Sequence, residues 1–207
     1  MGMILVLNVL SGDNIERVLA DPPLVWKVLA PDDEDIYQEA RLERSRSRVG
    51  WLGRLFGKKE PVHRPVNAEE EFELSEGELA DTDLDKAWSG LHFTLNGGDE
   101  DTGSPLGFLM YWGEYVADID AGFGPPRILR PAQVKEVHEA LTGLSNEEFK
   151  ARYQPKLMAK REVYPRIWDD EDCYQENLDY LEEYFEELKK FIAMANANNY
   201  GLIISIS

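Results

Sequence analysis

The residues best suited to chemistry are an aspartate and a histidine that lie seven positions apart. Asp85 and His92 would share one face of a helix, because seven residues are close to two helical turns. Trp88 would lie between them on the same face. A carboxylate that orients an imidazole is typical of general acid–base sites working near neutral pH. The spacing therefore indicates a candidate pocket.

Three further polar residues are candidates for the same pocket if folding brings them together. The complete candidate set is Asp85, Lys86, Trp88, His92, Glu114 and Arg127. A structural interpretation competes with this functional one. In it, Asp85 is an acid at a helix start and His92 is a core histidine bonded to the backbone. We favour the structural interpretation, because no nucleophile in a recognisable motif lies near the pair, and assign no catalytic residue.

The motif search supports neither a cofactor nor a metal. The sequence has no phosphate-binding loop, no Gly-x-Gly-x-x-Gly and no His-Glu-x-x-His, and its three histidines are scattered. The acidic run Asp169–Asp172 lacks the ligand spacing and turn glycine of a calcium loop, and it precedes a predicted helix whose dipole favours negative charge. We therefore expect no cofactor and no metal, and an enzyme is the less favoured class.

Composition and charge limit the protein's partners. The chain has 207 residues, of which 43% are hydrophobic, and this is enough for one domain with its own core. Asp and Glu number 40 against 22 Lys and Arg, so the formal net charge is −18. Such a charge repels phosphate groups, which argues against nucleic acid as a partner and favours a basic protein. The sequence does not indicate an oligomeric state.

Cysteine use and the first residues indicate the compartment. Cys173 is the only cysteine, so no internal disulfide can form, as is typical of a reducing compartment. The apolar run Met3–Leu10 is short and has no basic region before it, which predicts a strand rather than a signal peptide or a membrane span. We expect a cytoplasmic protein.

The C-terminal stretch from Tyr174 to Ser207 organises the predicted fold. Its apolar residues recur alternately four and three positions apart, which keeps them on one side of an α-helix. Further aromatic residues widen this stripe, as is typical of a helix that lies on a core. Asn198–Gly201 is predicted to end the helix, with Gly201 as a left-handed cap, and Leu202–Ile206 is predicted to be a strand.

The remaining elements complete the predicted fold class. Met3–Val9 resembles the terminal strand in composition, so we expect both runs in one sheet. Capping boxes at Thr82–Asp85 and Ser145–Glu148 predict two helices, and Ser104–Tyr111 is predicted to be another. The sequence therefore predicts a single α+β domain. It has a small mixed sheet with packed helices and a long C-terminal helix followed by a terminal strand.

A polar, charge-segregated segment at about residues 32–80 interrupts this pattern. We expect a mobile insertion there. Within it, Trp51, Leu55 and Phe56 would share one face of a short helix flanked by basic residues. This group is either a surface for docking a membrane or a partner, or an apolar cluster packed on the domain. Glycines weaken the helix, so we favour the packed cluster and do not expect membrane binding.

Several stretches of the chain resemble one known family in sequence and order. They are LDKAWSGLHFTLNG (84–97), PLGFLMYWGE (105–114), GFGPPRILRPAQV (122–134), LSNEEFKARY and VYPRIWD. On these motifs the chain resembles the YfbM-like family, a bacterial domain family of unknown function. The resemblance covers nearly the whole chain outside the insertion. Its most specific part is Asp-Lys-x-Trp-x-x-x-His, formed here by Asp85, Lys86, Trp88 and His92.

The resemblance implies an α+β domain from a bacterial cytoplasm and no particular reaction. The family usually has Thr or Ser where this chain has Arg130, so the helix cap before Pro131 is expected to differ. Two classes of function remain. The favoured one is a binding protein, antitoxin- or immunity-like, that occupies a basic partner. The alternative is a small-ligand binder or an enzyme that uses the pocket around Asp85, Trp88 and His92.

Overall fold

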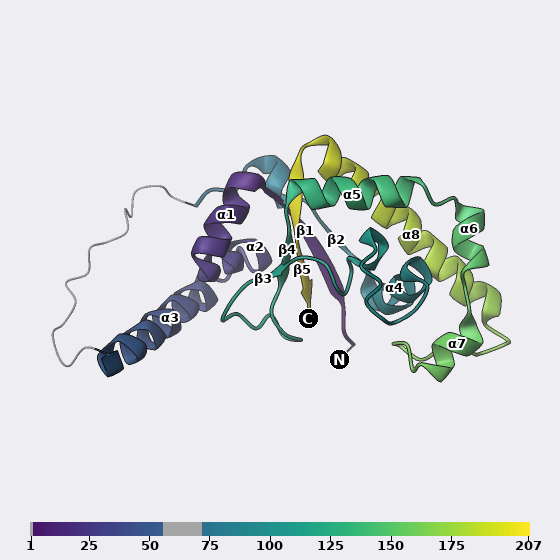
Figure 1. Ribbon diagram of the computed structural model, residues 1–207, viewed down its shortest axis with the longest axis horizontal. Coiled ribbons are helices and arrows are strands. Elements are labelled where there is room, and N and C mark those ends of the chain that lie inside the picture. The colour runs from purple at the N-terminus through teal and green to yellow at the C-terminus, as the bar shows by residue number, and fades with distance from the viewer. Residues whose placement is uncertain (1, 56–71) are drawn as a thin grey trace.

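A five-stranded sheet forms the centre of the computed structural model, which describes residues 2–55 and 72–207, with side chains over 2–46 and 72–207. The strands lie in the order β2-β1-β5-β4-β3 (Figure 1). They are β1 (Leu5–Ser11), β2 (Asp81–Asp83), β3 (Glu114–Tyr115), β4 (Arg127–Leu129) and β5 (Tyr200–Ile206).

All four strand pairings are antiparallel, so the prediction of a mixed sheet is wrong. The connection from β4 to β5 gives the physical reason. A parallel neighbour would require the chain to return to the starting end of β4. Instead the chain leaves β4 at Leu129, passes through several helices and enters β5 beside the same residue, since Leu129 pairs with Leu202.

Strands β1 and β5 carry buried apolar residues on both faces, because both faces are covered. Alternate residues of a strand point to opposite sides. On β1, Leu5, Leu7 and Val9 are fully buried in the larger core cluster. Leu10 belongs to a second, smaller cluster on the other face. The predicted placement of both terminal runs in one sheet is therefore confirmed.

The larger core cluster lies under helices that gather on one side of the sheet. These are α4 (Trp88–Asn96), α5 (Pro131–Thr142), α6 (Asn146–Ala151), α7 (Pro155–Lys160) and α8 (Tyr174–Ala197), and Figure 1 shows them together on the right of the sheet. α8 has the predicted bounds, and its apolar stripe contributes fully buried residues to this cluster. The long terminal helix thus forms one wall of the core.

The opposite face carries a smaller set of elements. α1 (Gly12–Ala20), the 3₁₀ turn η1 (Pro22–Val25) and α2 (Trp26–Leu29) supply Ile15, Val18 and Val28 to the second cluster. The Ser11 hydroxyl accepts a hydrogen bond from the Asn14 amide at 3.3 Å and so caps α1. α1 and α2 lie to the left of the sheet in Figure 1.

Gly201 lies in β5 and does not cap α8. Asn199 takes the left-handed conformation instead, with φ of +55°. A Cβ atom at position 201 would collide with the Leu129 carbonyl oxygen and with the Ile15 side chain. Glycine is therefore needed here for the close approach of β4 and α1, and the prediction of a glycine cap is wrong.

One of the two predicted capping boxes opens a helix. At the start of α6, Ser145 Oγ accepts from the Glu148 amide at 3.2 Å, and Glu148 Oε2 accepts from the Ser145 amide at 2.9 Å. Thr82, in contrast, lies in β2, where it pairs with Leu7. Strand pairing there overrides the local capping signal, and α4 begins only at Trp88.

The insertion is partly regular. α3 (Glu34–Leu55) covers a stretch that the composition predicted as a loop, and a 3₁₀ turn, η2 (Glu76–Leu79), leads into β2. Glu78 fixes that turn to the domain, because its carboxylate accepts hydrogen bonds from the Ser11 amide at 2.8 Å and Asn14 Nδ2 at 2.9 Å. Mobility of the insertion stays a prediction. Among the described residues, no helix is both long enough and apolar enough to cross a bilayer.

Leu181 is the position at which the packing of α8 is most simply tested. Its side chain is fully buried, and a Cβ at Gly90 of α4 would lie 3.0 Å from it. Leu181→Asp should lower the free energy of unfolding by at least about 4 kcal/mol, because it places an unpaired charge in the core. Glu183→Asp, an exposed change in the same helix, should cost less than about 1 kcal/mol. An unchanged melting temperature for Leu181→Asp would contradict this account of the core.

Candidate functional site

Asp85 is not on a helix with His92. It lies in the 3₁₀ turn η3 (Asp85–Ala87), with φ of +40°. Its carboxylate accepts a hydrogen bond from the Tyr180 hydroxyl at 2.8 Å, so it faces α8. The predicted alignment of Asp85, Trp88 and His92 on one helix face is therefore wrong. The reason is that β2 extends through Thr82 and Asp83 and delays the start of α4.

Trp88 and Lys86 serve the packing of the N-terminal residues. The Trp88 indole is buried, donates to the Met3 carbonyl at 3.1 Å and stacks on Tyr164 with ring centroids 5.9 Å apart. Lys86 is exposed, and its aliphatic stem lies against Gly2. Neither side chain is directed at the other candidates for the pocket.

His92 is sealed inside the domain. Only 4% of its surface is exposed, and the edge of its ring meets Tyr111 at a centroid distance of 5.2 Å. Neither ring nitrogen has a hydrogen-bond partner within the described part of the chain. Burial, and then the positive charge of Arg127, lower the pKa of His92 to about 4. The imidazole is therefore uncharged at neutral pH and has no access to a substrate.

Arg127 is a buried cation held by backbone carbonyl groups. It donates to the carbonyl oxygens of Phe108 at 3.0 Å, Trp112 at 2.6 Å and Leu109. Burial lowers the pKa of Arg127 to about 10, so the guanidinium remains charged at neutral pH. The planar fork of donors thus closes the irregular turn that follows η4 (Pro105–Gly107).

This turn replaces the helix predicted over residues 104–111, of which only the 3₁₀ turn forms. Carbonyl groups that would continue a helix point instead to Arg127. Glu114 lies apart from this cluster on the surface, where its carboxylate accepts from Arg130 at 2.9 Å. The structure thus brings His92 and Arg127 together and leaves the other four candidates in different surroundings. Both His92 and Arg127 are buried, so this pair belongs to the interior of the domain.

The docking residues predicted in the insertion fall mostly outside the described atoms. Trp51 and Leu55 lie in α3, but their side chains are not among those described. Phe56 lies outside the described residues. Docking by these three residues stays a prediction. Among the residues that the structure does describe, no three His, Cys, Asp or Glu side chains are grouped as metal ligands.

A surface that sequence reasoning missed lies where α8 passes β2 and η3. We call it the acidic–aromatic face, formed by Asp83, Asp85, Tyr180, Glu183, Tyr184 and Glu187. The two tyrosine rings meet edge to face at 5.1 Å and are half-buried. The sequence signal was present, since Tyr180 with Tyr184 and Glu183 with Glu187 are helical neighbours. Both tyrosines also widen the apolar stripe of the terminal helix, which predicts core positions for them.

The electrostatics of this face are one-sided. Burial and then the charges of Asp85, Asp83, Glu187 and Glu183 raise the pKa of Tyr184. The adjoining Glu182 and Glu186 are paired with Lys150 at 2.8 Å and Lys189 at 3.7 Å. In the part of the chain with described side chains, the four carboxylates around Tyr184 form no ion pair. The face therefore offers unneutralised negative charge beside two aromatic rings.

Comparison with known proteins agrees with the architecture. A family model described as a domain of unknown function, DUF1877, matches residues 1–205. The chain belongs to this family. The crystal structure of YfbM from Escherichia coli, a protein of unknown function, matches with a TM-score of 0.62, at 14% identity and over 99% of both chains. The resemblance predicted from the motifs is confirmed, and the match establishes the fold.

No curated protein matches the chain. The family description names no activity, so the function of these residues is inferred from the geometry of the chain itself. That geometry separates a sealed cluster around His92 from an open, charged face on α8.

The burial of His92 predicts a pH dependence of stability. Its pKa is about 4 in the folded protein against an ordinary value of 6.5. Between these values the unfolded chain binds a proton that the folded chain does not, so stability falls as pH decreases from about 6.5 to about 4. The contribution of His92 to this loss is about 3 kcal/mol. Denaturation at several pH values should show a shallower dependence in His92→Phe.

His138→Gln is the matched control, because His138 is only partly buried on α5. It should retain the pH dependence of the wild type. If His92→Phe and the wild type lose stability in parallel between pH 6.5 and pH 4, the buried-neutral account of His92 is wrong.

Proposed function

We propose that this protein is a non-catalytic binding protein whose acidic–aromatic face occupies a basic protein partner. The observation that carries the proposal is the group of four carboxylates around Tyr184, none of which forms an ion pair with a described side chain. Lysine and arginine side chains of a partner would neutralise this charge and pack on the tyrosine rings through cation–π contacts. A net charge of −18 would also speed the approach of such a partner.

The burial of His92 argues against the enzyme alternative at the predicted pocket. An acid–base catalyst needs a titratable group within hydrogen-bond reach of the substrate. His92 is 4% exposed, and Asp85, in η3, accepts a hydrogen bond from Tyr180 of α8. An antitoxin or immunity protein, by contrast, needs only a complementary surface. We infer a bacterial, cytoplasmic setting from the YfbM-like resemblance and from the single cysteine.

The test removes charge from the face without removing its rings. Glu183→Gln/Glu187→Gln deletes two exposed carboxylates of α8. Binding of an unstructured peptide rich in lysine and arginine is measured by fluorescence anisotropy at low and at physiological salt. The variant should bind about fivefold more weakly, since two exposed charge contacts contribute about 1 kcal/mol together.

Glu136→Gln/Glu147→Gln is the matched control. Both residues are exposed, and the double change removes the same net charge from α5 and α6. The control should bind the peptide within about twofold of the wild type, because neither carboxylate belongs to the acidic–aromatic face. Equal weakening by both double variants would show that only the overall charge attracts the peptide, and the proposed face would be wrong.

A further inference from the structure

The outer edge of β2 adjoins the acidic–aromatic face and has no neighbouring strand. β2 is the first strand in the order β2-β1-β5-β4-β3, so it is paired along one edge only, with β1. In an antiparallel strand, the backbone groups of successive residues point to alternate edges. Every second residue of β2 therefore directs its amide and carbonyl groups away from β1.

The hydrogen bonds between β1 and β2 identify these outward residues. The Val9 amide donates to the Ala80 carbonyl at 3.1 Å, and the Leu84 amide donates to the Leu5 carbonyl at 2.9 Å. Hydrogen-bonded pairs recur at every second residue of an antiparallel ladder, so Thr82, midway between Ala80 and Leu84, also directs its backbone groups to β1. The outward residues are the two that flank Thr82.

Asp81 and Asp83 are these outward residues. Both are exposed, and their amide and carbonyl groups have no hydrogen-bond partner in the described part of the chain. They present two donors and two acceptors along one edge, which is the pattern that an added strand pairs with. The backbone of β2 can therefore accept a strand from another molecule.

The opposite edge of the sheet is a poorer template. β3 has only two residues, and the carboxylate of one of them, Glu114, is paired with Arg130 at 2.9 Å. By contrast, neither Asp81 nor Asp83 forms an ion pair with a side chain that the structure describes. β2 thus combines an open edge with negative charge that is not neutralised.

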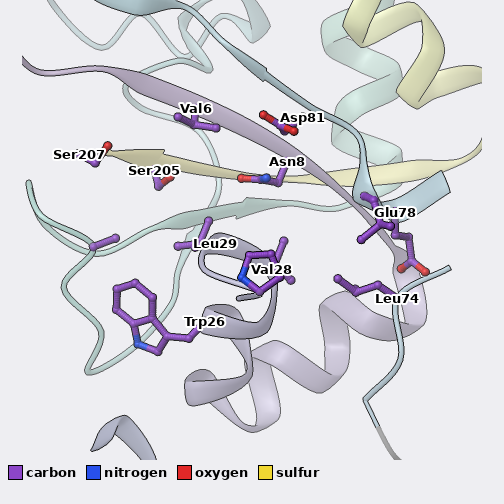
Figure 2. A pocket seen from close by; sticks show the side chains of 13 residues that line it. Val6, Asn8, Trp26, Val28, Leu29, Leu74, Glu78, Asp81, Ser205 and Ser207 are labelled. Atoms are coloured by element: carbon purple, nitrogen blue, oxygen red, sulfur yellow. The ribbon is translucent and has the colours of Figure 1, made fainter. Parts of the chain in front are cut away.

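The side chains of β2 decide which kind of strand fits. Figure 2 shows Asp81 beside Asn8, its partner in the register, where both line the cavity between the sheet and α2. Directly opposite residues of an antiparallel pair have Cβ atoms about 5 Å apart, so like charges repel and opposite charges attract. Pairing with β2 of a second copy would place aspartate opposite aspartate. A segment with a cation at every second residue would place one opposite Asp81 and another opposite Asp83.

Asp83 connects this edge with the acidic–aromatic face. It ends β2 and is also one of the four carboxylates around Tyr184 of α8. A cation held opposite Asp83 by strand pairing is therefore a cation of the kind that the acidic–aromatic face attracts. The edge and the face are continuous and favour the same partner.

We propose that the basic partner contributes an extended segment that adds to the sheet as an antiparallel strand beside β2. Its backbone exchanges hydrogen bonds with Asp81 and Asp83, and the residues that form these bonds are lysines or arginines. The inference rests on the proposed function, because it takes the same basic partner. It adds the conformation of that partner and the atoms of this chain that bind it.

The strand geometry is tested with an N-acetylated hexapeptide, Lys-Thr-Lys-Thr-Lys-Thr, and two forms that are methylated on the backbone. In an antiparallel pair, a lysine opposite Asp81 exchanges both hydrogen bonds with it, so the lysine amides face β2 and the threonine amides face away. Methylation of the three lysine amides should weaken binding at least about tenfold in fluorescence anisotropy, because two hydrogen bonds of about 1 kcal/mol each are lost.

The threonine-methylated peptide is the matched control, since it has the same charge and the same number of methyl groups. It should bind within about twofold of the unmethylated peptide. Equal binding of the two methylated peptides, or no binding of the unmethylated one, would overturn strand addition. The proposed function would still hold in that case if Glu183→Gln/Glu187→Gln weakens binding of the longer unstructured peptide and its control variant does not.

Two variants of this chain test the edge directly. Asp81→Asn and Asp81→Pro remove the same charge, but only proline removes the outward amide. Ala80 has φ of −77° and ψ of 132°, a conformation that suits a residue before proline, and an edge strand tolerates proline where the missing amide faces solvent. Asp81→Pro should therefore melt close to Asp81→Asn but bind the hexapeptide at least about fivefold more weakly. Equal affinities of the two variants would contradict the proposal.

Discussion

The pairing of β1 with β5 is the constraint on which the rest of the structure depends. These strands lie at the centre of the sheet, and their register runs from Leu5 with Ile206 to Ser11 with Tyr200. The pair separates the two core clusters, since neighbouring residues of each strand face opposite sides. α1, α5 and α8 pack against these two strands, on a surface that exists only after the first and last strands have met. The helices that local sequence patterns predict are therefore arranged around the β1–β5 pair, which joins the two ends of the chain.

This relation explains which parts of the fold could be predicted. α8 and α6 were predicted well, because an apolar stripe and a reciprocal cap are local signals. The prediction of a helix start at Thr82 was wrong, because the strand pairing of Thr82 with Leu7 outweighs a capping box. The helix over residues 104–111 failed because Arg127, distant in sequence, takes its carbonyl groups. In both cases a residue distant in sequence forms hydrogen bonds with backbone groups that the local pattern had assigned to a helix.

The functional surfaces show the same limit more strongly. Asp85 and His92 were chosen by spacing, but Tyr180 holds the first and the core encloses the second. The acidic–aromatic face combines β2, η3 and α8, which no short motif connects. The cavity between the sheet and α2 likewise combines β1, β5, α2 and the residues before β2. Composition indicated a basic partner, whereas the surface where a partner would bind appears only when distant segments are adjacent.

The arrangement of β1 and β5 also has a mechanical consequence. The strands are antiparallel, and the Ile4 and Ser207 backbones exchange two hydrogen bonds, at 2.9 and 3.0 Å, where the pair begins. Tension applied between these two ends acts across the strands and opens the ladder one pair at a time, as a zipper opens. A shearing pull would load all the bonds together. The central pair is therefore mechanically weak when it is pulled from this end, and an unfolding motor would meet the least resistance there.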